Sequence, residues 1–269
     1  TTTANGIGVL SWGVGGIEAE AAALGQPITT LVPQVVGIHL TGELRGGVSA
    51  MDAALTFAQM LRAKGVVGKF VECFGDGVAT LSATQRACIA NMTPEYGCTC
   101  TLFPVDDRTL EYLLLTGRDK EQVALVEAYA KAQGMWNDGA SRVYSEVLEL
   151  NLSDVECSLA GPSRPHDRFA RNDARSRFNA ICADRNLDMD KRVAVNFMGT
   201  EYELTHGAIA IAAVTSCTTA TDPAMMLACG LVAKHARERG LLAKPWVKRV
   251  MAPGSHATQL MLERAGLAQ

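Results

Sequence analysis

The sequence predicts an α/β fold in which helices and parallel or mixed sheets form layers. Between residues 35 and 92, apolar runs of strand length alternate with stretches that have helical periodicity and capping residues. The alternation returns near the C-terminus, where residues 209–214 are continuously apolar, as in strands buried on both faces. Because strands and helices alternate along the chain, we expect parallel strands joined by crossover helices.

The N-terminal region is rich in glycine and contains one short predicted helix. This alanine-rich helix covers residues 17–24 and ends at Gly25. The glycines lack the spacing of a dinucleotide-binding motif, and no apolar strand precedes them. We interpret them instead as positions where a helix packs closely on backbone. They are Gly6, Gly8, Gly13, Gly15 and Gly16.

The next part of the chain, residues 35–152, carries strands and capped helices in alternation. Two serine capping boxes, Ser49 with Asp52 and Ser82 with Gln85, each predict the first turn of a helix. Aspartates predict the start of two further helices. The predicted strands are residues 35–41, 67–74, 101–105 and 147–152. The predicted helices, each given from its N-cap to its last or terminating residue, are Ser49 to Gly65, Ser82 to Asn91, Asp107 to Gly117 and Asp119 to Gly134.

The C-terminal part begins with a polar connector and ends with a crossover unit. Residues 169–186 alternate in charge with little apolar periodicity, which predicts a surface connector. Asp222 and Pro223 predict the N-cap and the first position of a helix that ends at Gly240. The predicted strands are residues 192–197, 208–214 and 245–250, and a last helix follows His256. The order strand, loop, helix, strand predicts a parallel crossover.

The composition limits the classes of function. The formal net charge is -3 with mixed signs, which gives no electrostatic footprint for nucleic acid or an anionic membrane. No apolar run reaches about 18 residues, and no signal-peptide pattern occurs, so no membrane span is expected. The eight cysteines lack the spacing of a disulfide framework, which predicts a cytoplasmic location. The chain begins at Thr1 without an initiating methionine, as an excised segment would.

The residues alone suggest two candidate sites. Cys217 lies between the apolar run 209–214 and the helix that follows. Open α/β sheets bind ligands at such loops, and the positive end of the helix dipole stabilises a thiolate there. The alternative is that this cysteine acts as a small, buried packing residue. Asn91 at a helix end and Glu95 in the connection after it are the second candidates, although Glu95 also fits a solvated loop residue.

Five stretches resemble the aconitase family of iron–sulfur dehydratases, in one order and from Thr1 to about Gln269. The stretch with Cys217 resembles the first cluster-ligand segment of that family. The fourth stretch is typical of its bacterial and cytosolic branch. The five are GVGGIEAE (13–20), VVGKFVECFGD (66–76), ANMTPEYGCT (90–99), SLAGPSRPHD (158–167) and HGAIAIAAVTSCT (206–218).

The resemblance implies aconitase-like three-layer α/β/α domains with parallel or mixed sheets, incomplete in this chain. Residues 1–34 would end a first domain, and residues 35–150 would form a second. Residues 151–191 would be a connector, and residues 192–269 part of a third domain that carries the first cluster-ligand loop.

The resemblance also implies the chemistry, which is that of an iron–sulfur hydro-lyase interconverting citrate and isocitrate via cis-aconitate. Cys217 would be one of three cysteine ligands of a [4Fe-4S] cluster. Asn91 and Glu95 would face the cluster with its bound water or substrate, on the same side of one cleft as Cys217. The implied partners are a tricarboxylate substrate and the remaining domains of the same protein.

The implied enzyme is not complete in this chain. No Cys-x-x-Cys pair occurs, and one thiolate cannot hold a four-iron cluster, so the chain alone is expected to be inactive. The family's Asp-Ser-His triplet, serine base and arginines also lie outside these residues. Two alternatives stay open: a 2-methylcitrate dehydratase, and a non-catalytic remnant that acts as a scaffold or binds RNA. No basic stripe supports RNA binding.

Some positions depart from the family or have a structural interpretation. The family's asparagine two places after the cysteine is Thr219 here, and its Asn-Pro is Asp222-Pro223, which preserves the helix cap. Cys98 and Cys100 have the proximity of a metal-binding pair, but many family members have small other residues there, so we interpret both thiols as packing groups. Three side chains fit either an anionic ligand or a solvated connector, of which we favour the connector: Arg164, His166 and Arg168.

Overall fold

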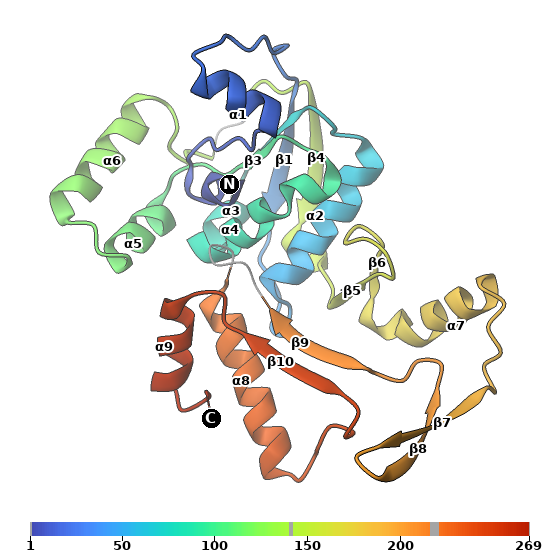
Figure 1. Ribbon diagram of the computed structural model, residues 1–269. Coiled ribbons are helices and arrows are strands. Elements are labelled where there is room, and N and C mark those ends of the chain that lie inside the picture. The colour runs from blue at the N-terminus through green and yellow to red at the C-terminus, as the bar shows by residue number, and fades with distance from the viewer. Residues whose placement is uncertain (1, 140–141, 216–220, 269) are drawn as a thin grey trace. The chain divides into compact units, whose positions relative to one another are not determined.

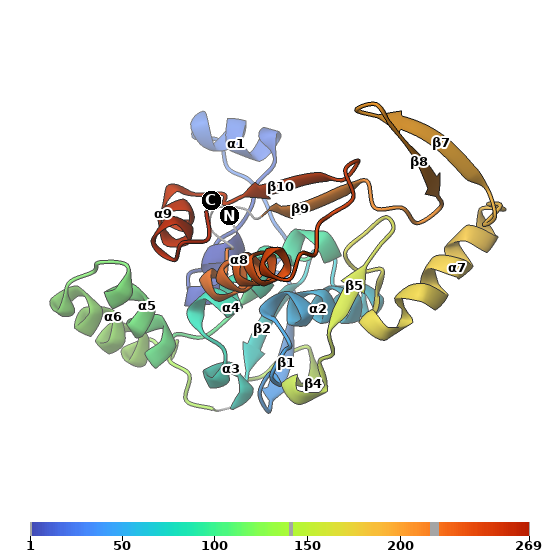
Figure 2. The same ribbon diagram turned by 90° about the horizontal axis from the view of Figure 1, so that it is seen from below.

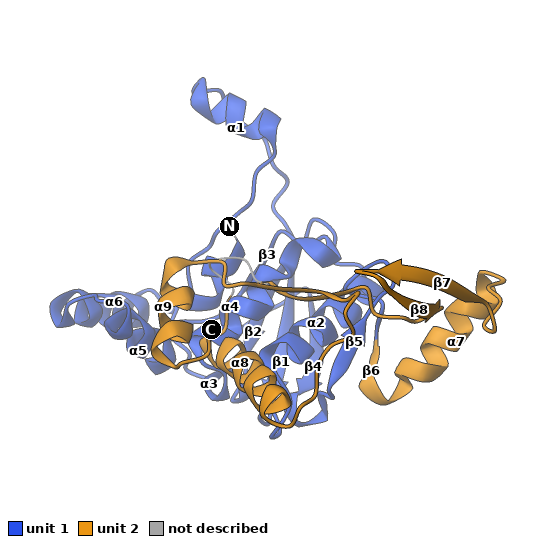
Figure 3. Cartoon of the chain, turned by 60° about the horizontal axis from the view of Figure 1, so that its bottom comes forward, with its two compact units in different colours: residues 1–168 blue, residues 169–269 orange. Residues whose placement is uncertain are grey.

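The computed structural model describes residues 2–139, 142–215 and 221–268. It divides into two compact units, Thr1–Arg168 and Phe169–Gln269, shown in different colours in Figure 3. Both units contain helices together with parallel strands, so the predicted α/β class is confirmed. The predicted domain boundaries after residues 34, 150 and 191 remain predictions.

The first unit is organised around a sheet of four parallel strands in the order β3-β2-β1-β4. Figure 1 labels β3, β1 and β4 of this sheet. The helices between consecutive strands supply the crossovers that parallel pairing needs. All four predicted strands are present, with bounds that differ from the predicted ones by up to three residues. They are β1 (Val35–Thr41), β2 (Phe70–Phe74), β3 (Cys100–Leu102) and β4 (Glu146–Asn151).

Both serine capping boxes are confirmed. The Ser49 hydroxyl accepts from the Asp52 nitrogen at 3.2 Å, while the Asp52 carboxylate accepts from the Ser49 nitrogen at 2.7 Å. Ser82 and Gln85 cap their helix in the same reciprocal way. The remaining elements of the first unit are η1 (Thr2–Ile7), α1 (Gly16–Ala23), α2 (Ala50–Lys64), α3 (Gly77–Thr80), α4 (Ala83–Asn91), η2 (Thr93–Tyr96), α5 (Asp107–Leu115), α6 (Lys120–Ala132), η3 (Leu152–Asp154) and β5 (Ser158–Ala160), with β6 (Arg168–Ala170) after them.

The start of α5 differs from the prediction by one residue. Asp106, and not Asp107, is its N-cap, and the Asp106 carboxylate accepts from the Arg108 nitrogen at 3.0 Å. Two consecutive aspartates are equally good caps by sequence. The choice between them is made by a tertiary contact, because Asp106 also pairs with the buried Arg86.

One face of the sheet packs on α2 and α4 and holds the core. Val36, Ile38 and Leu40 alternate along β1 and are buried, as the period of two along a strand requires. Phe57 and Leu61 of α2 belong to the same cluster. On the opposite face, the side chains of β1, β2 and β4 are half-buried or exposed. The sheet is therefore two-sided, with one dry face and one accessible face.

The 3-10 helix η1 lies directly against α4. A Cβ on Gly6 would lie 2.5 Å from the Ala87 nitrogen, and a backbone atom cannot rotate away. This confirms the predicted role of Gly6 in close packing. For Gly13 and Gly16 the same prediction is wrong, because no described atom lies within 4 Å of a Cβ at either position. The Phe103 nitrogen donates to the Asn5 carbonyl at 2.9 Å, which ties η1 to the end of β3 as well.

We expect Gly6→Ala to lower the free energy of unfolding by about 2 kcal/mol, since forced overpacking typically costs roughly 1–3 kcal/mol. Gly13→Ala is the matched control because, among the described residues, no atom lies within 4 Å of a Cβ at that position. Urea unfolding of both variants, followed by circular dichroism, measures the difference. Equal stability of the two variants would contradict the close approach of η1 to α4.

The second unit contains the predicted crossover. Strands β9 and β10 pair in parallel, and α8 lies between them in sequence. Asp222 caps α8 as predicted, because its carboxylate accepts from the Ala224 nitrogen at 3.1 Å. The elements of this unit are η4 (Arg171–Asp173), α7 (Ala174–Asp184), β7 (Arg192–Phe197), β8 (Thr200–Thr205), β9 (Ile211–Thr215), α8 (Pro223–Glu238), β10 (Lys248–Ala252) and α9 (His256–Arg264).

Three elements of this unit were not predicted from the sequence. The 3-10 helix η4 and the helix α7 occupy the segment that was expected to be a connector. Strand β8 pairs antiparallel with β7 and forms the hairpin seen in Figure 2. The two loop residues, Met198 and Gly199, have φ angles of 50° and 81°, which is the pattern of the type I′ turns favoured in tight hairpins.

Two further features concern only the described residues. The seven cysteines among them are free thiols, so no disulfide forms within the described part of the chain. Within those same residues, no helix combines the length and the apolar character needed to cross a membrane.

Candidate functional site

Asn91 is the last residue of α4 and is half-buried. Its side-chain nitrogen Nδ2 donates to the Thr3 hydroxyl at 3.0 Å, and its backbone carbonyl oxygen accepts from the Thr2 hydroxyl at 3.5 Å. The predicted end of the helix at this residue is confirmed. The amide is therefore held at the C-terminal end of α4 by groups from η1, a segment 88 residues earlier in the chain.

Glu95 lies in the short turn η2, and its side chain is exposed. Buried hydroxyls fix the backbone of this turn. Thr93 donates to the Ala90 carbonyl at 2.6 Å, and the Tyr96 hydroxyl donates to the Thr93 hydroxyl at 3.3 Å. The Tyr96 hydroxyl also bonds to that of Thr101 in β3. The Glu95 side chain is thus solvent-accessible on a well-supported turn, four residues after Asn91.

A buried ion pair, which the sequence analysis missed, anchors α4. Arg86 is fully buried, and its guanidinium makes two hydrogen bonds to the Asp106 carboxylate, at 2.8 and 2.6 Å. It also donates to the carbonyl oxygens of Val78 and Leu81 at 2.9 and 3.1 Å. This bidentate geometry is the strong form of a charge-assisted hydrogen bond. It connects the helix that ends in Asn91 to the loops before and after it.

Cys98 and Cys100 are buried, as their predicted packing role requires. The Cys98 sulfur donates to the carbonyl oxygens of Lys69 and Cys100 at 3.0 and 3.1 Å. Burial raises the pKa of Cys98 to about 11 and that of Cys100 to about 12. Both side chains are therefore neutral thiols near pH 7, whereas a metal ligand or nucleophile must be a thiolate.

The segment with Arg164, His166 and Arg168 is tied to α2 through its last arginine. The Arg168 guanidinium donates to the hydroxyl of Ser158 at 2.8 Å and to the side-chain oxygen of Gln59 at 3.1 Å. Arg164 is exposed, and His166 is half-buried. Arg168 is thus engaged in internal contacts, which supports a structural role for it.

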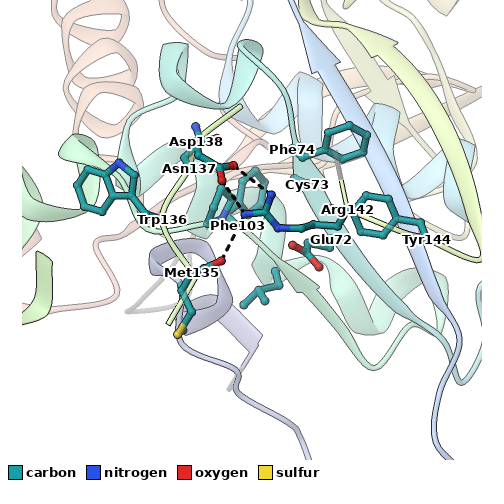
Figure 4. A pocket seen from close by; sticks show the side chains of 14 residues that line it. Glu72, Cys73, Phe74, Phe103, Met135, Trp136, Asn137, Asp138, Arg142 and Tyr144 are labelled. Carbon is teal, nitrogen blue, oxygen red and sulfur yellow. Dashed lines mark hydrogen bonds and ion pairs between the residues drawn. The ribbon is translucent and has the colours of Figure 1, made fainter. Parts of the chain in front are cut away.

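A separate pocket of about 120 Å³ lies at the carboxyl ends of β2 and β3 (Figure 4). Figure 4 shows the Arg142 side chain crossing it beside the Glu72 carboxylate, and Arg142 pairs with Asp138 at 3.1 Å. Burial raises the pKa of Glu72, and the positive charge of Arg142 opposes that shift. Neither Asn91 nor Glu95 lines this pocket, so it is distinct from the predicted site.

Cys217 lies outside the described residues, and so does Thr219. Within the described residues, no three side chains of His, Cys, Asp or Glu gather closely enough to hold a metal ion. The described part of the chain therefore does not by itself fit a four-iron cluster. The structure brings Asn91 and Glu95 to one end of α4, while their position relative to Cys217 remains a prediction.

Comparison with known proteins agrees with these motifs. A family model described as the aconitase family (aconitate hydratase) matches residues 1–269. Aconitate hydratase A of Legionella pneumophila is 51% identical over 269 residues, which cover 99% of this chain and 30% of that protein. Aconitate hydratase A of Escherichia coli is 53% identical, with 99% and 30% covered. The corresponding protein of Rickettsia bellii is 50% identical, with 100% and 31% covered.

The match extends over the whole of this chain but over a limited part of each relative. The chain spans about 30% of the length of the curated relatives it matches. Because the family model covers every residue, the chain belongs to the aconitase family.

Proposed function

We propose that this chain contributes catalytic and cluster-binding residues to an iron–sulfur hydro-lyase that interconverts citrate and isocitrate via cis-aconitate. The observation that carries the proposal is the family match over residues 1–269, with relatives named aconitate hydratase A at about half identity. The substrate is then a tricarboxylate. The reaction removes a hydroxyl and a proton from neighbouring carbons and adds them back in the other order.

The described geometry suits the roles that we propose for Asn91 and Glu95. A general base needs a carboxylate that can reach its proton, and Glu95 has an exposed side chain on a turn fixed by buried hydroxyls. A group that orients a ligand needs a fixed side chain, and the Asn91 amide is hydrogen-bonded and half-buried. We assign Glu95 to holding or accepting a proton and Asn91 to orienting the bound group.

Cys217 is the cysteine that we propose as a cluster ligand. Aconitases use a [4Fe-4S] cluster, which supplies a Lewis-acidic iron when it is bound. This chain would provide one of three cysteine thiolates, from a residue that lies between β9 and α8 in sequence. The N-terminus of a helix lowers the pKa of a thiol close to it, which favours the thiolate that ligation requires.

The proposal is tested on the full product of the reading frame that encodes this chain, purified anaerobically and loaded with iron and sulfide. We expect it to hydrate cis-aconitate, and the loss of the alkene absorbance measures this reaction. Glu95→Gln should lower kcat by about 10²- to 10⁴-fold, the usual contribution of general acid–base catalysis. Glu121→Gln removes another exposed carboxylate, on α6, and should leave kcat unchanged.

Two results would overturn the proposal. The first is absence of turnover on cis-aconitate by the iron-loaded wild-type protein. The second is a kcat/KM for 2-methylcitrate dehydration that exceeds the value for citrate, which would assign the site to the other substrate.

A further inference from the structure

We infer that Thr3 is a positioning residue for the reaction, because its hydroxyl fixes the orientation of the Asn91 carboxamide. The inference rests on the proposed function, since it assigns Asn91 the role of orienting the bound group. It concerns a contact that joins the first few residues of the chain to the end of α4. The Asn91 Nδ2 atom donates to the Thr3 Oγ1 atom at 3.0 Å.

The Thr3 hydroxyl is itself held in place. Thr3 is 8% exposed, and it lies in η1, which approaches α4 so closely that Gly6 has no space for a Cβ. The other side of η1 is tied to the sheet, since the Phe103 nitrogen donates to the Asn5 carbonyl at 2.9 Å. Two separate contacts, one with a helix and one with the end of a strand, therefore fix the position of this hydroxyl.

An asparagine needs such a partner because its terminal torsion is soft. The χ2 angle of asparagine has a broad, nearly two-fold distribution, and a rotation by half a turn exchanges the oxygen with the nitrogen. A hydrogen bond from Nδ2 to the Thr3 hydroxyl restricts this rotation and holds the carboxamide in the orientation that the structure shows. In that orientation the carboxamide oxygen is turned away from the Thr3 hydroxyl.

Thr2 provides an internal control for this argument. Its hydroxyl also bonds to Asn91, but to the backbone carbonyl and at the longer distance of 3.5 Å. Thr2 is 5% exposed, so its burial is like that of Thr3. A general loosening of η1 on α4 would affect both threonines. Of the two hydroxyls, that of Thr3 bonds to the Asn91 side chain, so the change at Thr3 is the one expected to disturb the orientation of the amide.

The test compares Thr3→Val, Thr3→Ser and Thr2→Val in the full, iron-loaded product of the reading frame. Thr3→Val keeps the shape of the side chain but removes the hydroxyl, and it should lower kcat on the order of 10- to 100-fold while KM changes by less than about threefold. Thr3→Ser restores the oxygen and should recover kcat to within about threefold of wild type. The kcat of Thr2→Val should also stay within about threefold of wild type. The thermal unfolding midpoint of this variant detects any loosening of η1.

A second measurement is independent of activity. The side-chain amide of Asn91 gives a pair of NMR signals, identified by their loss in Asn91→Ala. In Thr3→Val these signals should shift and their hydrogens should exchange faster with water, whereas Thr3→Ser and Thr2→Val should resemble wild type. Unchanged Asn91 signals in Thr3→Val would overturn the inference.

The kinetic result can overturn it as well. If Thr3→Val alters the Asn91 signals but keeps the wild-type kcat, the contact exists without a role in positioning for the reaction. A kcat loss of the same size in Thr2→Val would assign the effect to the packing of η1. If the wild-type protein has no turnover, the proposed function fails, and the Asn91 signals alone then decide whether Thr3 fixes the amide.

Discussion

Cys217→Ser in the full product of the reading frame is expected to abolish both cluster assembly and hydration of cis-aconitate. The proposed site holds the cluster by three thiolates, and a serine hydroxyl is a poor ligand for an iron of this kind. Loss of one ligand should therefore release the whole cluster and leave activity below about one thousandth of wild type, since the reaction depends on the bound iron. Iron content per protein and the visible absorbance of the cluster, measured after anaerobic reconstitution, check the prediction together with turnover.

Two other cysteines are the matched controls. Cys98→Ser replaces a buried thiol with a raised pKa, and Cys229→Ser replaces a half-buried thiol in α8, the helix that follows Cys217 in sequence. Each change should cost roughly 1–2 kcal/mol of stability, as expected for a buried polar replacement, and both variants should keep the cluster. Full iron content and turnover in Cys217→Ser, or loss of both in Cys98→Ser, would show that the ligand has been assigned to the wrong residue.

The parts of the fold that depend on neighbouring residues were predictable from the sequence. A capping box needs only a serine and a polar residue three positions later, and both boxes of the first unit form as predicted. The Asp222-Pro223 start of α8 is equally local. Strand β8 could also have been predicted, because residues 200–205 alternate in polarity after a Met198-Gly199 turn.

The parts that depend on distant residues were not predictable. Arg86 appears in the sequence as an ordinary helical arginine, and its partner Asp106 follows 20 residues later. One signal was present, since Arg86 lies among the buried small residues Ala83, Ala87 and Ala90 on one face of α4. An arginine in such a place needs a buried partner, but the sequence does not say which one.

The candidate site shows the same division. The positions of Asn91 and Glu95 at a helix end and in the following turn were predictable, because Pro94 and Gly97 mark them in the sequence. The hydroxyl of Thr3 beside Asn91 was not, because it comes from a segment that the chain brings back through tertiary packing. The resemblance to a family suggested the residues for which we propose roles in the reaction, and the structure adds the side chains that contact Asn91.

The ion pair between Arg86 and Asp106 leads to the largest expected change in stability. We expect Arg86→Met to lower the free energy of unfolding by about 3–5 kcal/mol, the usual result of removing one partner of a buried pair. The Asp106 carboxylate would then remain 9% exposed without its counter-charge. Two carbonyl oxygens, those of Val78 and Leu81, would also lose a donor.

The control is the double variant Arg86→Met with Asp106→Ser. Serine keeps the N-cap of α5, where Asp106 accepts from the nitrogen atoms of Arg108 and Thr109, but it removes the negative charge. If the single variant is destabilised chiefly by an uncompensated buried carboxylate, the double variant should be more stable than Arg86→Met by about 1–2 kcal/mol despite its additional change. Urea unfolding of the wild type and both variants, followed by circular dichroism, gives the three free energies. A double variant less stable than Arg86→Met would mean that the lost hydrogen bonds to Val78 and Leu81, and not the buried charge, account for the effect.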